Sequence, residues 1–396
     1  MLGFRDLLRL ELRSLLADRA ILLTLFGGIL FYSFLYPQPY LNQTPRELPV
    51  VLVDEDGSQL SRQLAFMADA TPEVRLTDQV ATLAEAEQLV NAGQASGLLH
   101  IPRHFYRDIM LGRSVTVGYG GDASYFLVYG ALAQGLAAAS GTLAAKIKVV
   151  RLLTHGEPLP AASQGWSAVS LNLVPVFNPT MGYVDYVVPG VFVLILHQIL
   201  LMGAALVGAT QNQITVRGGE GYWQSAPAGA LLLARTLVIG AGYLLPMLYM
   251  LGFCLDHYGV AREASALQMV LLMLPFELAT LWLGVVLGAL FVRRDLPSQV
   301  VLVSSMPLIF VAGFIWPLEM VPAPLRWLSQ WVPATAGIQG SLRLNQMGAD
   351  IGQISPQLMQ LWGLAVLYGL LAWWLLAWRQ RTLLKPRPVS HDVQAP

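Results

Sequence analysis

Six apolar stretches in this 396-residue chain are each long enough to cross a lipid bilayer. A helix needs about 20 mostly apolar residues to cross the hydrocarbon core. Helix is favoured there because lipid offers the backbone no hydrogen-bond partners. The predicted spans are Ala20–Tyr36, Val187–Ala209, Thr236–Leu255, Ala266–Val292, Leu296–Trp316 and Leu358–Trp378. The sequence therefore predicts an α-helical integral membrane protein with six transmembrane helices.

The composition supports this class and excludes others. Hydrophobic residues make up 55% of the chain and charged residues only 12%, whereas soluble domains carry about 25% charged residues. The net charge is zero, so charge gives no reason to expect nucleic-acid binding. Cys254 is the single cysteine, so no disulfide can form within one chain.

Most of the polar sequence lies in one block, residues 37–182, after the first span. Strand-like and helix-like runs alternate in it, which predicts an inserted α/β domain. The predicted strands are Pro49–Asp56, Glu73–Thr77, Gly97–Ile101, Ser114–Tyr119 and Ala168–Val176, and the predicted helices are Ser58–Ala68, Thr82–Asn91, Pro102–Met110 and Ser124–Leu153. Ser58 is expected to cap the first of these helices, and Gly93 to end the second.

The distribution of Lys and Arg predicts the orientation. Twelve of these residues flank the spans on the side of the termini, and three lie in the opposite short loops. This positive-inside bias places both termini in the cytoplasm and residues 37–182 outside it.

The other segments follow from this topology. Residues 1–19 are predicted to form an amphipathic helix at the cytoplasmic interface, and the alternative is a simple cytoplasmic extension of the first span. Its apolar face would carry Phe4, Leu7, Leu8, Leu12, Leu15 and Leu16. The first span lies in residues 20–36, before the external block. Residues 183–292 contain spans two to four, with a Gly-rich cytoplasmic segment at 210–229. Residues 293–379 hold spans five and six, with an external segment at 317–357 suited to short re-entrant or interfacial helices. Residues 380–396 form a cytoplasmic tail.

Two segments resemble the ABC-2 class of ABC transporter permeases. The run GFIWPLEMVPAPLRWLSQWVPATAGIQGSLRL, Gly313–Leu344, is similar to the signature region of that class. A second run, RGGEGYWQSAPAGALLLARTL at Arg217–Leu237, resembles the cytoplasmic segment by which permeases of that class dock on an ATPase. The acidic run of the family is reduced to one carboxylate in this chain. The coupling residues implied by this resemblance are Arg217, Glu220, Tyr222, Trp223 and Pro227.

The resemblance also implies partners and a location. It implies an exporter in a bacterial inner membrane, built from two permease subunits, alike or different, with a separate cytoplasmic ABC ATPase. The layout of one span, an external domain and five further spans resembles the subfamily that works with a periplasmic membrane-fusion protein. No phosphate-binding G-x-x-x-x-G-K-[ST] motif occurs in the chain. ATP and Mg²⁺ are therefore expected on the ATPase, and no cofactor on this chain, which is not expected to be an enzyme.

Five polar side chains inside predicted spans are candidates for the translocation path. They are His197, Gln198, Glu277, Ser304 and Ser305. A buried ionisable side chain in a membrane is unfavourable and is often functional. The alternatives are hydrogen bonds between helices and, for Glu277, a hydrogen bond at the kink left by Pro275.

No metal site is predicted. The side chains of Asp54, Glu55 and Asp56 diverge at a strand end, so a solvated turn fits them better than a cation site. His100 and His104 flank Pro102 and lack the partners of a zinc site.

The function predicted from these features is export of an amphipathic, drug-like or lipid-like substrate. An alternative is a membrane-anchored external binding or assembly protein with no transport role. A third possibility, an ion-coupled carrier, predicts internal repeats and several buried charges, and neither is evident in the sequence.

Overall fold

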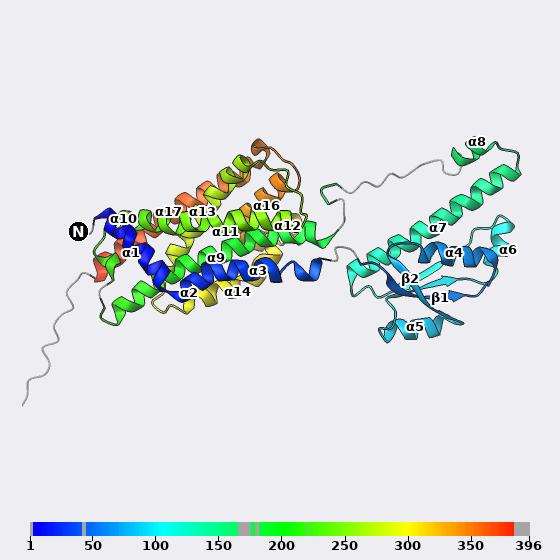
Figure 1. Ribbon diagram of the computed structural model, residues 1–396, viewed down its shortest axis with the longest axis horizontal. Helices are drawn as coiled ribbons and strands as arrows, with labels where there is room; N and C mark the ends of the chain where they lie inside the picture. Colours follow the sequence, from blue (N-terminus) through cyan, green and yellow to red (C-terminus); the bar gives the residue numbers. More distant parts are fainter. Residues whose placement is uncertain (1–2, 42–44, 165–175, 179–181, 220, 384–396) are drawn as a thin grey trace, which may run out of the picture. The chain divides into compact units, whose positions relative to one another are not determined.

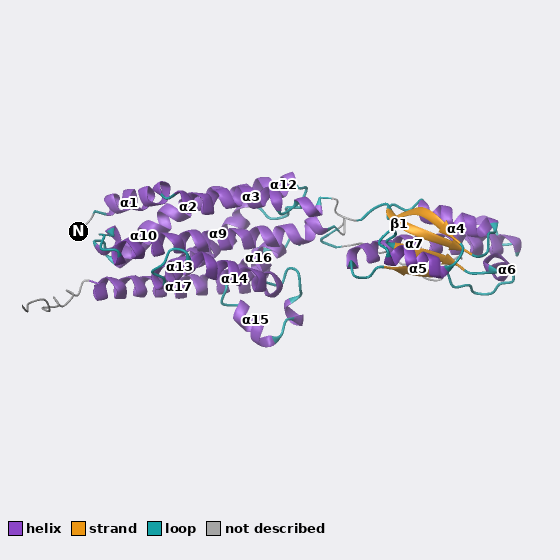
Figure 2. Ribbon diagram, turned by 90° about the horizontal axis from the view of Figure 1, so that it is seen from below, coloured by secondary structure: helices purple, strands orange, loops and turns teal. Residues whose placement is uncertain are grey.

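The computed structural model describes residues 3–41, 45–164, 176–178, 182–219 and 221–383. The chain forms two compact units, Met1–Leu41 with Val176–Pro396, and Asn42–Pro175. The first unit is a bundle of helices, and the second combines helices with a four-stranded sheet, as Figure 1 and Figure 2 show.

The bundle contains long helices interrupted by short helical turns, three of them π-helical. Its elements are α1 (Phe4–Ala17), α2 (Arg19–Leu22), the π turn η1 (Leu23–Gly27), α3 (Gly28–Leu35), η2 (Gln38–Tyr40), α9 (Tyr183–Val216), η3 (Tyr222–Gln224), α10 (Ala228–Arg235), the π turn η4 (Thr236–Gly240), α11 (Ala241–Leu248), the π turn η5 (Tyr249–Cys254), α12 (Leu255–His257), α13 (Ala266–Leu290), α14 (Leu296–Val311), η6 (Leu318–Met320), α15 (Ala323–Ser329), α16 (Pro333–Asn345), η7 (Ile351–Ile354) and α17 (Ser355–Leu383).

Five predicted spans lie in helical runs long and apolar enough to cross a membrane. These runs are Arg19–Tyr40, Tyr183–Val216, Ala228–His257, Ala266–Leu290 and Ile351–Arg381. The predicted span Leu296–Trp316 is wrong in length, because α14 ends at Val311 after 16 residues. The chain bends after Val311, and Gly313 adopts a φ of 81°, a left-handed conformation that ends the helix.

A sixth helix of span-like length and composition is α7 (Phe126–Thr154), which lies in the second unit. This confirms a long helix close to the predicted Ser124–Leu153. Its buried Leu132, Leu136 and Leu143 recur at helical spacing and pack in the core of the α/β unit. The apolar stripe of α7 is therefore explained by packing on a sheet.

The long helix α9 is at the centre of the bundle and is buried along most of its length. It crosses α13 where both helices carry small residues. A β-carbon at Gly284 would lie 2.8 Å from the carbonyl oxygen of Leu201, and one at Gly288 would lie 2.7 Å from that of Ala205. Without a hydrophobic driving force in lipid, such close backbone packing is what holds membrane helices together.

The predicted external segment 317–357 contains the short helices α15 and α16. Helix α16 is buried and packs against α9, α13 and α17. Gln339 on α16 donates a hydrogen bond from Nε2 to the carbonyl oxygen of Gly313 at 2.8 Å. This bond ties α16 to the bend that ends α14.

The second unit is a small three-layer α/β structure. Its strands, in the order β2-β1-β3-β4, are β1 (Leu48–Asp54), β2 (Val74–Val80), β3 (Gly97–Ile101) and β4 (Gly118–Gly121), and its helices are α4 (Gln59–Asp69), α5 (Leu83–Asn91), α6 (Phe105–Met110), α7 and α8 (Leu159–Gln164). Strand β1 pairs in parallel with β2 and β3, and β4 is antiparallel to β3. Helices α4 and α7 cover one face of the sheet and α5 covers the other (Figure 1).

The predicted N-terminal cap at Ser58 and the predicted helix end at Gly93 are both confirmed. The side chain of Ser58 accepts a hydrogen bond from the amide of Ser61 at the start of α4. Gly93 has a φ of 70° just after α5.

Two predictions here need correction, and a third is not tested. Helix α6 begins at Phe105 and not at Pro102, because His104 takes a left-handed φ of 64° before it. Strand β4 begins at Gly118, although Ser114–Tyr119 was predicted as a strand. The predicted strand Ala168–Val176 lies almost wholly outside the described residues.

Candidate functional site

The loop between α9 and α10 carries the residues predicted to meet an ATPase. Arg217 follows the last turn of α9 and is exposed. Pro227 is exposed immediately before α10. Glu220 lies outside the described residues. Of the predicted coupling residues that the structure describes, Arg217 and Pro227 are thus the exposed ones.

Trp223 is buried, whereas a residue that contacts an ATPase is expected on the surface. Its ring is only 2% exposed, and its Nε1 donates a hydrogen bond to Oγ1 of Thr215 at 3.2 Å. Gln380 on α17 donates from Nε2 to the carbonyl oxygens of Trp223, at 2.7 Å, and Ala226, at 2.8 Å. The indole is therefore packed inward and bonded to α9, and Gln380 ties the backbone of the loop to α17.

Beneath this loop lies a buried ion pair between α1 and α10. Nε of Arg235 donates to Oε1 of Glu11 at 2.9 Å, and both side chains are at most 2% exposed. Tyr222 lies beside the pair, and burial raises its pKa from 10.0 to about 12. Removing one partner of a buried pair leaves an uncompensated charge, so this contact fixes α1 to the start of the third span.

The sequence carries a signal for this pair that the amphipathic pattern of residues 1–19 alone does not reveal. Glu11 lies four residues from both Leu7 and Leu15, and these three form the buried stripe of α1. Phe4, Leu12 and Leu16, predicted on the same apolar face, are exposed. A carboxylate in the middle of an apolar helical stripe indicates a buried cation on a neighbouring element.

Two further polar contacts join the same end of the bundle. Nη2 of Arg294, in the turn between α13 and α14, donates to Oδ2 of Asp18 at 2.8 Å. Asp18 also accepts from the amide of Ala20 at 3.0 Å and so caps α2. Asn212 near the end of α9 donates from Nδ2 to the carbonyl oxygens of Gly288, at 2.7 Å, and Phe291, at 2.8 Å. We call α1, the α9–α10 loop and the α13–α14 turn, together with these contacts, the α1 end.

His197 and Gln198 lie on α9 and Glu277 lies on α13, two helices that pack against each other. The ring of His197, on α9, lies 6.3 Å from that of Phe276, the neighbour of Glu277 on α13. His197 is fully buried and Glu277 is 4% exposed. Among the described residues, neither nitrogen of His197, nor Nε2 of Gln198, nor Oε1 of Glu277 has a hydrogen-bond partner.

The alternative predicted for Glu277 is a hydrogen bond at the kink left by Pro275. Within the described chain, Glu277 makes no hydrogen bond to the kink at Pro275. Its carboxyl group faces Gly240, where a β-carbon would lie 3.3 Å from Oε1. The nearby Tyr243 donates to the carbonyl oxygen of Leu196 at 2.8 Å. Buried polar atoms without partners are uncommon in folded proteins, which makes this group of side chains a candidate for function.

Ser304 and Ser305 are accounted for within α14. Their hydroxyl groups donate to the carbonyl oxygen of Val301, at 2.9 Å and 2.8 Å. Bonds of this kind to the preceding turn satisfy the hydroxyls without a second helix. The structure therefore does not link these two serines to His197 by a hydrogen bond.

The acidic turn after β1 is built around Asp54. Its Oδ1 accepts from the amides of Asp56, at 3.0 Å, and Gly57, at 2.9 Å, and its Oδ2 accepts from Oγ of Ser61 at 2.7 Å. In the described ranges, no group of three His, Cys, Asp or Glu side chains is arranged to hold a metal ion.

The fold defines a multi-pass membrane protein with an α/β unit inserted after its first span. The chain belongs to the ABC-2 family transporter proteins, whose family model matches residues 19–374. It is 24% identical over 364 residues to the inner membrane transport permease YhhJ of Escherichia coli (strain K12), with 89% of this chain and 90% of the relative covered. The protein of the same name from Shigella flexneri matches equally well.

Proposed function

We propose that the chain is the transmembrane permease subunit of an ATP-driven ABC exporter in a bacterial inner membrane. The substrate class is an amphipathic, drug-like or lipid-like molecule. Membership of the ABC-2 family and a relative named as an inner membrane transport permease support the permease role. ATP and Mg²⁺ would bind to a separate ABC ATPase, and this chain would carry no cofactor.

The observation that carries the ATP-driven mechanism is the α1 end. The α9–α10 loop is bonded to α9 and α17, α1 is joined to α10 by the buried Glu11–Arg235 pair, and the α13–α14 turn is joined to the α1–α2 hinge by Arg294 and Asp18. A force applied to the exposed loop would therefore be transmitted to several spans at once. Such a surface suits a motor on another chain, and it would face the cytoplasm, with both termini there.

The remaining partners follow from the same proposal. A second permease subunit, the same or different, would complete the path across the bilayer. The α/β unit would lie outside the inner membrane, where a periplasmic membrane-fusion protein is a candidate partner. His197, Gln198 and Glu277 would line the path, because their unpartnered polar atoms lie on the two central helices.

The experiment uses the permease co-purified with its co-encoded ATPase in lipid nanodiscs. Arg217→Glu reverses an exposed charge on the loop, and we expect weaker association and at least about a tenfold loss of permease-stimulated ATP hydrolysis. Arg326→Glu reverses an exposed charge on α15, far along the chain from the α1 end, and is the matched control. Equal ATP hydrolysis by wild type and Arg217→Glu would remove the α9–α10 loop from the coupling contact.

The alternative, an external binding or assembly protein anchored by inert spans, has a separate test. Residues 42–175 form their own compact unit, so they can be replaced by a short Gly/Ser linker. Substrate-stimulated ATP hydrolysis that survives this replacement would contradict the alternative. Loss of hydrolysis with the ATPase still bound would favour it.

A further inference from the structure

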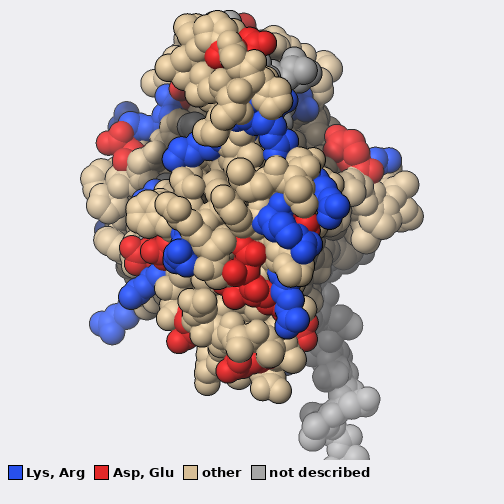
Figure 3. Space-filling view, turned by 90° about the vertical axis from the view of Figure 1, so that its right-hand side faces the viewer, with Lys and Arg blue, Asp and Glu red and all other residues tan. Residues whose placement is uncertain are grey.

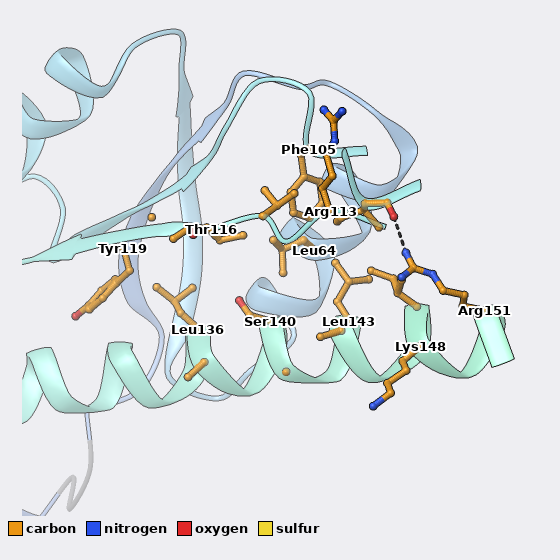
Figure 4. A pocket seen from close by; sticks show the side chains of 18 of the residues that line it. Leu64, Phe105, Arg113, Thr116, Tyr119, Leu136, Ser140, Leu143, Lys148 and Arg151 are labelled. Atoms are coloured by element: carbon orange, nitrogen blue, oxygen red, sulfur yellow. Dashed lines mark hydrogen bonds between the residues drawn. The ribbon is translucent and has the colours of Figure 1, made fainter. Parts of the chain in front are cut away.

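A hollow in the α/β unit lies between α7 and the segment that leads from α6 into β4. It has a volume of about 1120 Å³, slightly above the range of about 300–1,000 Å³ typical of ligand pockets. Its walls are mainly apolar and include Leu64, Phe105, Ile109, Leu136 and Leu143. Figure 4 shows Leu136, Ser140 and Leu143 of α7 on one side and Leu64, Phe105 and Thr116 on the other.

The hollow exists because α7 carries short side chains where it faces the sheet. Ala133, Ala137, Ser140, Gly141 and Ala144 all line it. Ala137 and Ala144 remain exposed although they face an apolar space. Apolar surface left in contact with water is unfavourable by about 25 cal/mol per Å², so an apolar occupant would be bound favourably here.

One end of the hollow is basic. Arg151 of α7 reaches across it, and its Nη2 donates to the carbonyl oxygen of Ile109 at 2.6 Å. Arg113 and Lys148 flank the same end, and Figure 4 shows their charged groups directed outward, away from the apolar space. Within the described chain, Lys148 makes no ion pair, and Arg113 has an exposed contact of 3.5 Å with Asp108.

The balance of charge favours an anion at this end. Among the residues that line the hollow, Arg113, Lys148 and Arg151 oppose a single carboxylate, Glu157. On the face drawn in Figure 3, basic and acidic side chains lie side by side. Long basic side chains at the edge of an apolar surface keep their charges in water while their stems cover the apolar part.

We propose that this cavity binds a single-chain amphiphile with an anionic head group. The alkyl chain lies along α7 between Leu136 and Leu143, and the head group lies at the Arg113, Lys148 and Arg151 end. The site belongs wholly to the α/β unit, and its binding activity does not depend on the proposed permease role.

The test uses the full-length protein in nanodiscs of zwitterionic phosphatidylcholine. A dodecanoate that carries a diazirine on its chain is photolysed with the protein, and the labelled peptides are identified by mass spectrometry. We expect labelling of α7 and of residues 113–119. Unlabelled dodecanoate should compete, and dodecyltrimethylammonium, which has the same chain and the opposite charge, should not.

Neighbouring alanines provide a matched pair of variants. Ala137 lines the cavity and Ala138 does not, and both are exposed on α7. Ala137→Phe should fill the space and lower labelling at least about tenfold, whereas Ala138→Phe should leave it unchanged. Ala144→Phe is a second filling variant, so that a folding defect of Ala137→Phe would not decide the result.

The head-group end is tested in the same way. Arg151→Gln removes a lining charge, and Lys146→Gln removes an exposed charge of α7 that is not part of the cavity. Loss of a charged hydrogen bond should weaken competition by dodecanoate at least about tenfold in Arg151→Gln, with no change in Lys146→Gln.

Three results would overturn the proposal. They are labelling confined to the spans, equal labelling of wild type and both filling variants, and equal competition by the cationic amphiphile. A protein occupant is detected with Ala144→Cys, because the native Cys254 is buried in the bundle. Dodecanoate should slow the reaction of this cysteine with maleimide. Protection that dodecanoate does not alter would instead identify a second copy or another protein as the occupant.

Discussion

Arg235 donates a hydrogen bond to Glu11 across 2.9 Å, although 224 residues separate them in the sequence and both side chains are buried. The pair joins the N-terminal helix α1 to α10, the first segment of the third span. Because α10 follows directly on the exposed α9–α10 loop, any movement of the loop acts on α1 through this contact.

The first prediction is that the pair stabilises the α1 end. Glu11→Ala leaves the Arg235 guanidinium buried without its partner and should lower the free energy of unfolding by about 3–5 kcal/mol. The double variant Glu11→Leu with Arg235→Met replaces both charges by apolar groups and should recover most of that loss. Thermal unfolding in nanodiscs measures both.

An exposed pair on the same helix is the control for this prediction. Arg9 and Asp6 are 3.9 Å apart on the surface of α1, and Asp6→Asn should change stability by less than about 1 kcal/mol. A Glu11→Ala variant as stable as Asp6→Asn would show that the buried pair does not hold α1 in place.

A second prediction concerns coupling through Asp18 and Arg294. Nη2 of Arg294 lies 2.8 Å from Oδ2 of Asp18, and Asp18→Asn weakens this contact. The change should lower the free energy of unfolding only slightly, because Arg294 is partly exposed. It should nevertheless lower permease-stimulated ATP hydrolysis several-fold, because the α13–α14 turn is released from the α1–α2 hinge. Asp295→Asn breaks the exposed contact with Arg293 and should leave hydrolysis unchanged. Equal loss in both variants would indicate an effect of charge alone.

Much of this fold could be predicted from local patterns. Hydrophobic runs located five spans, and the alternation of strand-like and helix-like runs predicted the α/β unit. The end of α14 could not be predicted, because residues 312–316 continue its apolar run without a break. The bend at Gly313 depends on a hydrogen bond from Gln339, which lies in a later helix. The roles of Trp223 and Glu11 were hidden for a similar reason. Each depends on a partner that lies more than one element away in the sequence, Gln380 for Trp223 and Arg235 for Glu11.

A third prediction is that the crossing of α9 and α13 does not tolerate a side chain. Gly288→Val would place a β-carbon 2.7 Å from the carbonyl oxygen of Ala205, so the helices must separate and the folded protein should be lost. Gly363→Val on α17 changes a position with no heavy atom within 4 Å of the added β-carbon. The yield of monodisperse protein after size-exclusion chromatography compares the two. Similar yields would contradict the argument from close packing.

A fourth prediction separates a path-lining role of Glu277 from a structural one. Oε1 of Glu277 is buried without a hydrogen-bond partner, so Glu277→Met should raise stability by about 1–3 kcal/mol by removing an unsatisfied polar group. If Glu277 lines the path, the same variant should slow substrate transport in proteoliposomes. A destabilised variant with normal transport would instead assign Glu277 a structural role.

The last prediction is a dependence of stability on pH that originates at Tyr222. Burial raises the pKa of Tyr222 from 10.0 to about 12, so the folded protein holds this phenolic proton more tightly than the unfolded chain. The resulting stability is fully present below pH 10 and is lost as the pH rises towards 12. Across this interval, wild type should lose about 2–3 kcal/mol more than Tyr222→Phe, which keeps the ring and lacks the hydroxyl group. Parallel unfolding curves for the two proteins between pH 10 and 12 would place the Tyr222 hydroxyl in water rather than beside the Glu11–Arg235 pair.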